Sequence, residues 1–279
     1  MDWNNVLLAA TLFAALGLLF GVALAIASRL FAVKEDTRVS AITEALPGAN
    51  CGGCGYSGCA AYAEAVVNGE AEPHLCMAGG ERAARAISEA MGIPVKIGPR
   101  MHAQVMCSGN KHTAHYKYQY VGAQDCVAAE QMGGGDKCCP NGCVGLGTCA
   151  AACPYDAIEV VDGLAKVNSE LCRGCGACVS SCPKQIIRMI PYGTAHWVAC
   201  LSVENGKITR QQCDVGCISC RICEKSCPQG AIRVNDFVAR IDYESCIGCG
   251  VCASKCPRHI IQFVKSDTVA HHLNKMGEV

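Results

Sequence analysis

Cysteine is the residue of this sequence with the clearest capacity for chemistry. The 279-residue chain contains 25 cysteines and 30 glycines, and most of the cysteines stand in tight, repeated clusters. Thiolates bind zinc and iron–sulfur clusters, and a typical centre of either kind takes four of them. A disulfide scaffold is instead typical of short secreted chains. The length, the odd cysteine count and the clustering therefore favour metal centres over disulfides.

The first cysteine motif has the spacing CxxCxxxxCx16C and consists of Cys51, Cys54, Cys59 and Cys76. Four thiolates can complete one [4Fe–4S] cluster. The glycines between the first three cysteines allow positive φ, so that the backbone can wrap closely around a bulky inorganic core. The motif therefore predicts a cluster, with zinc or free thiols as the alternatives.

Three longer motifs in the C-terminal half have the form CxxCxxCxxxCP. The CP positions are 29 residues apart within each pair of units and the pairs are 74 apart, which indicates a duplicated two-unit module. The motifs resemble those of two-cluster bacterial ferredoxins, in which the fourth cysteine of one run binds the other cluster. The resemblance implies three ligand sets: Cys172, Cys175, Cys178 with Cys153; Cys217, Cys220, Cys223 with Cys256; and Cys246, Cys249, Cys252 with Cys227.

One unit of the first module departs from this rule, because Leu146 stands where the middle cysteine is expected. A set of four can still be made from Cys139, Cys143, Cys149 and Cys182. Cys138 is an alternative to Cys139, and a [3Fe–4S] cluster is the alternative if neither reaches the site. Five [4Fe–4S] clusters are therefore expected, and they use twenty of the 25 cysteines.

Five cysteines remain unassigned. One is Cys138, beside Cys139. The other four lie before the first module or in the loop between the modules, and they are Cys107, Cys126, Cys200 and Cys213. These four can converge on a sixth [4Fe–4S] site that joins the middle of the chain to the inter-module loop. Unligated thiols are an equally good interpretation, and a zinc site is a third.

Other classes of function find little support in the sequence. Several glycine-rich segments match GxGxxG or GxGxxA, but none follows an expected strand, as a dinucleotide site requires. No catalytic residue is apparent, so the chain itself is expected to be an electron carrier. Lys+Arg and Asp+Glu number 24 each, so the zero net charge gives no electrostatic case for nucleic acid.

Residues 6–27 contain no charged side chain. As a helix they span about 33 Å, enough to cross a bilayer core. A signal peptide would carry positive charge before a shorter apolar run, and a buried helix of a soluble domain is the other alternative. Arg29, Lys34 and Arg38 follow the run. The positive-inside rule therefore predicts a single pass of the cell (inner) membrane, with the N-terminus outside and the cluster domains in the cytoplasm.

The elements that must position the cysteines are short. Helices are expected at 39–46, 59–67 and 81–91, and residues 116–120 alternate as a strand does. The expected class is α+β, with a single N-terminal transmembrane helix, a small helical [4Fe–4S] domain and tandem two-cluster ferredoxin-like modules. The expected boundaries are 1–33 for the anchor, 34–98 for the N-terminal domain, 99–137 for a connecting segment, 138–192 for the first module, 193–212 for the inter-module loop, 213–265 for the second module and 266–279 for a tail.

The order of these parts resembles the B subunit of the Rnf complex. The segments GCVGLGTCAAACPYDAI and CDVGCISCRICEKSCPQGAI are similar to the longer, anaerobe-type version with two ferredoxin modules. Rnf is a membrane ferredoxin:NAD+ oxidoreductase that pumps Na+ or H+. The resemblance implies an electron-transfer subunit of this translocase, which takes electrons from reduced ferredoxin and relays them through [4Fe–4S] clusters to membrane partners, while a flavoprotein subunit handles NAD.

Two other functions compete with this interpretation. One is a ferredoxin-like electron-transfer subunit of another membrane-bound dehydrogenase. The CxxCxxxxCx16C domain beside the membrane helix argues against it. The other is a metal-binding scaffold without a redox role.

Overall fold

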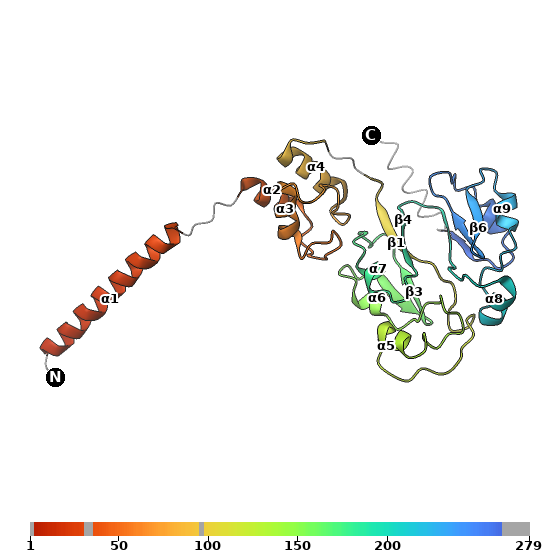
Figure 1. The fold of residues 1–279 in the computed structure, drawn as a ribbon, viewed down its shortest axis with the longest axis horizontal. Coiled ribbons are helices and arrows are strands. Elements are labelled where there is room, and N and C mark those ends of the chain that lie inside the picture. The colour runs from red at the N-terminus through yellow and green to blue at the C-terminus, as the bar shows by residue number, and fades with distance from the viewer. Residues whose placement is uncertain (1–2, 31–35, 95–97, 264–279) are drawn as a thin grey trace.

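The computed structural model describes residues 3–30, 36–94 and 98–263, and Figure 1 shows their arrangement. The expected tail at 266–279 and Lys34, which entered the orientation argument, lie outside these ranges. Short helices and two-stranded sheets alternate along the described chain. The mixture of helix and strand agrees with the α+β class.

Helix α1 (Trp3–Leu30) is the longest element, and it stands apart from the remaining elements (Figure 1). Its Val6–Arg29 stretch is 24 residues long, apolar, and not buried against the rest of the chain. A helix of this length and composition can cross a membrane. It is the one such helix among the described residues.

Three helices form the N-terminal cysteine domain: α2 (Thr37–Ala45), α3 (Cys59–Val67) and α4 (Gly80–Met91). Their shared core contains the fully buried side chains of Ile42, Tyr62 and Ile87. The helices expected at 59–67 and 81–91 are confirmed, and α4 ends at Gly92 in the left-handed conformation that favours glycine. The small core leaves the cysteine loop between α2 and α3 on one side of the domain.

Two similar β arrangements follow. The first contains strands β1 (Met101–Val105), β2 (Ile158–Val161), β3 (Leu164–Val167) and β4 (Ile187–Pro191), with helices α5 (Cys126–Gln131), α6 (Thr148–Ala151) and α7 (Ala177–Ser181). The second contains β5 (His196–Val198), β6 (Ile232–Asn235), β7 (Val238–Ile241) and β8 (Ile261–Phe263), with α8 (Gly206–Gln212), α9 (Ile222–Ser226) and α10 (Val251–Ser254). In each, an antiparallel hairpin (β2–β3 or β6–β7) accompanies a second antiparallel pair (β1–β4 or β5–β8).

The outer strands β1 and β5 come from upstream of the modules that they complete. Strand β1 lies in the segment expected only to connect, and β5 lies in the expected inter-module loop. Val105 pairs with Ile187, and Val198 pairs with Ile261. The segments before each module therefore contribute to the fold of that module.

The strand expected at residues 116–120 is wrong. Only Tyr116 forms a bridge, to Lys137. The neighbouring side chains bind the backbone of the loop after α5: the Lys117 ammonium donates to the Gly133 carbonyl at 2.9 Å, and the Tyr118 hydroxyl donates to the Met132 carbonyl at 2.6 Å. Side-chain hydrogen bonds to a loop therefore replace the backbone ladder that the alternation suggested.

Cysteines form a large part of both module cores. In the first, Cys143, Cys149, Cys172 and Cys178 are buried among small aliphatic side chains and isoleucines. In the second, Cys200, Cys217, Cys223, Cys252 and Cys256 are buried in the same way. Aromatic residues make up only 5% of the chain. The thiols thus occupy the positions that large apolar side chains fill in an ordinary core.

The N-terminal domain touches the first module at one very close contact. The Cα of Gly53 packs against the backbone of Cys175, and a Cβ on residue 53 would lie 1.9 Å from the Cys175 carbonyl oxygen. Only glycine allows this approach. The first cysteine motif therefore rests directly on a predicted ligand loop of the first module.

Candidate iron–sulfur sites

The four thiols of the first motif, Cys51, Cys54, Cys59 and Cys76, line one cavity, and Cys175 of the first module lines it too. Asn50 orders this loop, since its side-chain oxygen accepts a hydrogen bond of 2.8 Å from the Cys59 amide. The pKa of Cys76 is raised chiefly by burial and further by the other three thiolates of the motif. The structure thus brings together the set expected from the spacing.

Tyr155 lies between this site and the next. Its pKa is raised by burial and then by the thiolates of Cys51 and Cys175, which belong to different motifs. The next predicted set is Cys172, Cys175, Cys178 and Cys153. The pKa of Cys178 is raised to about 12, chiefly by burial and then by neighbouring thiolates that include the other three of this set. The other three thiols of this set therefore lie near Cys178.

The second module contains two comparable groups of thiols. Cys217, Cys220, Cys223 and Cys256 line one cavity. The pKa of Cys252 is raised by burial and by the thiolates of Cys246 and Cys227, members of its own predicted set. Cys220 and Cys249 are exposed, and the other 23 cysteines of the chain are buried or half-buried.

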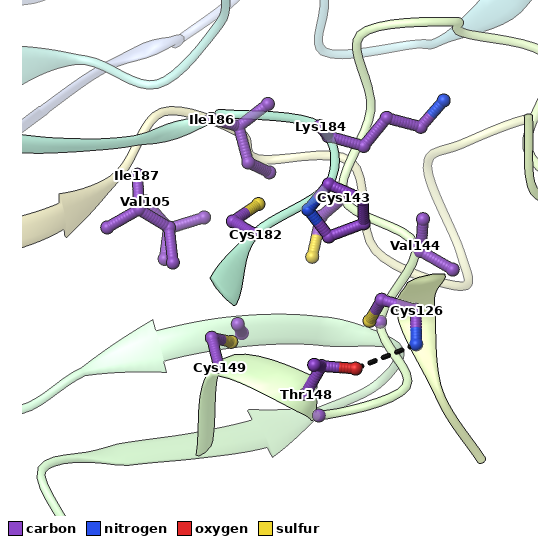
Figure 2. Close-up of a pocket in the computed structure, with 14 residues that line it drawn as sticks. Val105, Cys126, Cys143, Val144, Thr148, Cys149, Cys182, Lys184, Ile186 and Ile187 are labelled. Carbon is purple, nitrogen blue, oxygen red and sulfur yellow. Dashed lines mark hydrogen bonds between the residues drawn. The ribbon is translucent and has the colours of Figure 1, made fainter. Parts of the chain in front are cut away.

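The remaining site of the first module is formed differently from the expectation. Figure 2 shows its cavity, which is lined by Cys126, Cys143, Cys149 and Cys182. Cys139, expected here from the sequence, lines another cavity instead. The pKa of Cys149 is raised to about 12 by burial and then by the thiolates of Cys143, Cys126 and Cys182. Cys126 thus lies at the cavity where Cys139 was expected.

A short hydrogen-bond network holds Cys126 beside this cavity. The Cys126 amide donates to the Thr148 hydroxyl oxygen at 2.7 Å, as Figure 2 shows, and that hydroxyl donates to the Asp125 carboxylate at 2.7 Å. Asp125 also caps α5 by accepting from the amides of residues 127 and 128. The pKa of Asp125 is lowered chiefly by the Thr148 hydrogen bond. Sequence reasoning missed this link because Thr148 and Asp125 lie in separate segments.

Replacing Thr148 with valine should loosen this site. Valine keeps the shape of the side chain but removes both hydrogen bonds, so the Cys126 amide and the Asp125 carboxylate lose their link. We expect iron release to a chelator from this site to be about tenfold faster, an effect typical of lost outer contacts around a metal site. Thr148→Ser retains the hydroxyl and should release iron at the native rate. Equal rates in both variants would contradict a positioning role for Thr148.

Cys139 faces a cavity shared by the two modules. It lies there with Cys107, Cys200 and Cys213. The pKa of Cys139 is raised to about 11, chiefly by burial and then by the thiolates of Cys107 and Cys213. Three members of the expected sixth set therefore meet, with Cys139 in the place expected for Cys126. Cys138 lines neither this cavity nor the one around Cys149.

These thiol sets suit an inorganic cluster. Among the described residues, no three cysteine, histidine or carboxylate side chains converge tightly enough to bind a single metal ion. The thiols are instead distributed around cavities. Thiols bind iron as thiolates, so cluster binding would displace their protons, and iron would supply the compensating charge. The donor chemistry and the arrangement both fit [4Fe–4S] clusters.

The fold and these sites define an iron–sulfur protein, and comparison with known families agrees. Residues 46–78 match an Fe–S cluster family, residues 139–193 match the LdpA Fe–S cluster-binding domain, and residues 216–260 match the 4Fe–4S dicluster domain. Cys107, Cys126, Cys200 and Cys213 lie outside these matches. The matched segments lie in the N-terminal domain and in both modules.

Curated relatives extend over most of the chain. The B subunit of the Na(+)-translocating ferredoxin:NAD(+) oxidoreductase complex of Acetobacterium woodii is 43% identical over 86% of this chain and 73% of its own length. The B subunit of the ion-translocating oxidoreductase complex of Methanosarcina acetivorans is 41% identical over 83% of this chain and 88% of its own length. The B subunit of the proton-translocating ferredoxin:NAD(+) oxidoreductase complex of Clostridium ljungdahlii is 39% identical over 86% and 85%. The chain belongs to this family, the B subunits of the Rnf ion-translocating oxidoreductase complexes.

Proposed function

We propose that this chain is the electron-transfer subunit of a membrane ion-translocating ferredoxin:NAD+ oxidoreductase. One observation carries the proposal: Cys175 of the first module lines the same cavity as the four thiols of the first motif, so two predicted sets of thiols meet there. The thiolate of Cys51 raises the pKa of Cys175, and the thiolate of Cys149 raises that of Cys178, in both cases after burial as the main cause. A series of neighbouring clusters is suited to moving electrons. When bound, each cluster accepts and passes on one electron.

The ligand sets that we propose combine the sequence expectations with the arrangement of the thiols. The first motif holds one cluster and the second module holds two, as expected from the spacing. In the first module Cys153 completes the set of Cys172, Cys175 and Cys178, and Cys126 completes the set of Cys143, Cys149 and Cys182. These are five [4Fe–4S] clusters in an N-terminal domain and tandem ferredoxin-like modules with the expected boundaries, except that β1 and Cys126 of the connecting segment belong with the first module and β5 belongs with the second.

The chain residues supply burial and hydrogen bonds to the ligand sulfurs, which set cluster potentials. The Ala103 amide donates to the Cys172 sulfur, and the Ala157 amide donates to the Cys153 sulfur, each at 3.4 Å. Such donors stabilise the additional negative charge of the reduced state. Their presence at two ligands of one set supports a redox site.

The two ends of the series fit different partners. The N-terminal domain follows the apolar helix α1, so we place this end at the membrane, beside other Rnf subunits, with the cluster domains on the cytoplasmic side. The exposed thiols Cys220 and Cys249 both belong to the second module. Exposure of ligands brings these two sites near the surface, where reduced ferredoxin can deliver electrons. Electrons then pass from the second module toward the membrane.

The test of this function is the reduction of the full chain, purified anaerobically, by reduced ferredoxin. Iron, acid-labile sulfide and zinc are measured first, and the reduced protein is then examined by EPR. We expect about four irons for each set and low-potential signals that appear when ferredoxin is added. Cys223→Ser should lose about four irons and one signal, whereas Cys138→Ser should lose none. Zinc-filled sites without EPR signals would establish the scaffold function instead.

A further inference from the structure

A buried cation lines the cavity that Figure 2 shows. It is Lys184, which follows Cys182 by two residues and has a side chain that is only 7% exposed. The Lys184 ammonium binds the carboxylate of Glu130 on α5 at 2.5 Å. In Figure 2 this ammonium is directed away from the sulfurs of the cavity. The positive charge nearest to Cys182 in sequence is therefore paired with a carboxylate outside the cavity.

Glu130 reaches this position because of its place on α5. Cys126 is the first residue of α5, and Glu130 follows it by one helical turn, so both lie on the same side of the helix. The segment that contains α5 is longer than the corresponding segment of the second module. Each segment ends in a CxxGC sequence: Cys139 follows the end of β1 by 34 residues, whereas Cys213 follows the end of β5 by 15. The first module thus gains its carboxylate from the longer segment.

The second module has an equivalent cation that lacks a carboxylate. Arg258 is 74 residues after Lys184, which is the separation of the two modules, and it also follows a CP cysteine, Cys256, by two residues. Arg258 lines the cavity of its own set of thiols. Its guanidinium donates to the carbonyls of Cys213 and Gly216 at 2.7 and 3.4 Å. None of the ion pairs among the described residues includes Arg258.

We infer that Glu130 is a positioning residue that lowers the reduction potential of the neighbouring cluster by pairing with Lys184. The inference rests on the proposed electron-transfer function, in which the cavity of Figure 2 holds a [4Fe–4S] cluster. Reduction adds one electron and thus one negative charge to a cluster, and an unpaired cation beside it stabilises that state. A carboxylate in contact with the cation cancels much of its field. Glu130 therefore keeps this cluster more strongly reducing than Lys184 alone would.

Burial makes the pairing effective. The Glu130 side chain is 34% exposed and that of Lys184 is 7% exposed, so water and salt screen these charges less than they screen an open surface pair. The loop after α5 also packs on the ammonium, since a Cβ on residue 134 would lie 3.6 Å from the Lys184 Nζ. The charge of one partner therefore acts on the surroundings when the other is removed.

The experiment is an EPR-monitored redox titration of the full-length chain, purified anaerobically. Glu130→Gln leaves the cation unpaired and should raise the potential of one cluster. At a fixed applied potential, the ratio of its reduced to its oxidised form should rise about tenfold, which corresponds to about 59 mV for one electron. Lys184→Met leaves the carboxylate unpaired and should lower the potential of the same cluster by a similar amount. The double variant loses both charges and should return near the native potential.

Glu81→Gln is the matched control. It removes the same charge from an exposed pair with Arg85 in the N-terminal domain, where water screens the interaction, so all potentials should stay native. Iron content is measured in every variant and should match that of the native chain. Cys149→Ser identifies the signal of the affected cluster. If that variant does not fold, the signal that moves in opposite directions in the two single variants identifies it.

The outcomes separate the role of Glu130 from the proposed function. Opposite shifts that cancel in the double variant require charge pairing, because an ion pair that only fastens α5 would give no rescue. Native potentials in all three variants, or shifts of equal sign in both single variants, would overturn the role of Glu130 and leave ferredoxin-reducible clusters standing. A native chain without iron would contradict the proposed function itself. If one single variant fails to fold, the other still decides the sign of the shift.

Discussion

Replacing Gly53 with alanine is expected to reduce turnover of the assembled complex by roughly ten- to a hundredfold while leaving the iron content unchanged. The new Cβ would lie 1.9 Å from the Cys175 carbonyl oxygen, so the N-terminal domain cannot keep its contact with the first module. Overpacking of this kind costs about 1–3 kcal/mol, which lowers the docked population by the stated factor. Electrons would then be held on one side of this contact.

The measurement is ferredoxin-dependent turnover together with the magnetic interaction between the reduced clusters on either side of the contact. Gly98→Ala is the matched control, because a Cβ there meets no atom within 4 Å. We expect the interaction to weaken in Gly53→Ala alone. Native turnover and an unchanged interaction would show that the contact has no part in electron transfer. Lost iron would instead indicate damage to the first cysteine motif.

Replacing Lys137 with methionine is expected to lower the reduction potential of a neighbouring cluster by on the order of 50–100 mV. Lys137 is buried and lines the shared cavity. Burial raises the pKa of Cys143, and the positive charge of Lys137 partly opposes that rise. Reduction adds a negative charge to a cluster, so a nearby cation stabilises the reduced state and raises the potential. Removing that cation must shift the potential downward.

An EPR-monitored redox titration measures this shift. Lys137→Gln also removes the charge and can still donate a hydrogen bond to one of the two carbonyls, so it should show the same shift if methionine impairs folding. Lys111→Gln is the control, because the Lys111 ammonium is half exposed and pairs with Asp162 at 2.6 Å. Water screens such a pair. Unchanged potentials in both Lys137 variants would rule out an electrostatic role for this residue.

The local parts of the structure were predictable because their signals lie close together in the sequence. The glycine-rich loop at residues 51–59 and the helix that follows it were expected where the structure places them. The long apolar helix was evident from composition alone. Short-range spacing is sufficient wherever one segment supplies most of the thiols of a site.

The partners of Cys126 and Cys139 were not predictable in this way. Both precede the first complete motif, and counting alone could not decide which one replaces the cysteine absent at Leu146. The decision depends on tertiary contacts: Thr148 fixes Cys126 beside Cys149, and the duplication brings Cys139 opposite Cys213. The equal spacing of the two CxxGC segments was the available signal for the second choice.

The outer strand pairs have a consequence for how the protein is made. The hairpins β2–β3 and β6–β7 turn through Asp162-Gly163 and Asp236-Phe237, whose positive φ angles allow tight two-residue turns and rapid local folding. Strand β1, in contrast, pairs with residues 82 to 90 positions later in the chain. During synthesis the buried thiols of the first module therefore stay accessible until β4 has left the ribosome. The core of the first module therefore closes only after all of its cysteines, through Cys182, have been synthesised.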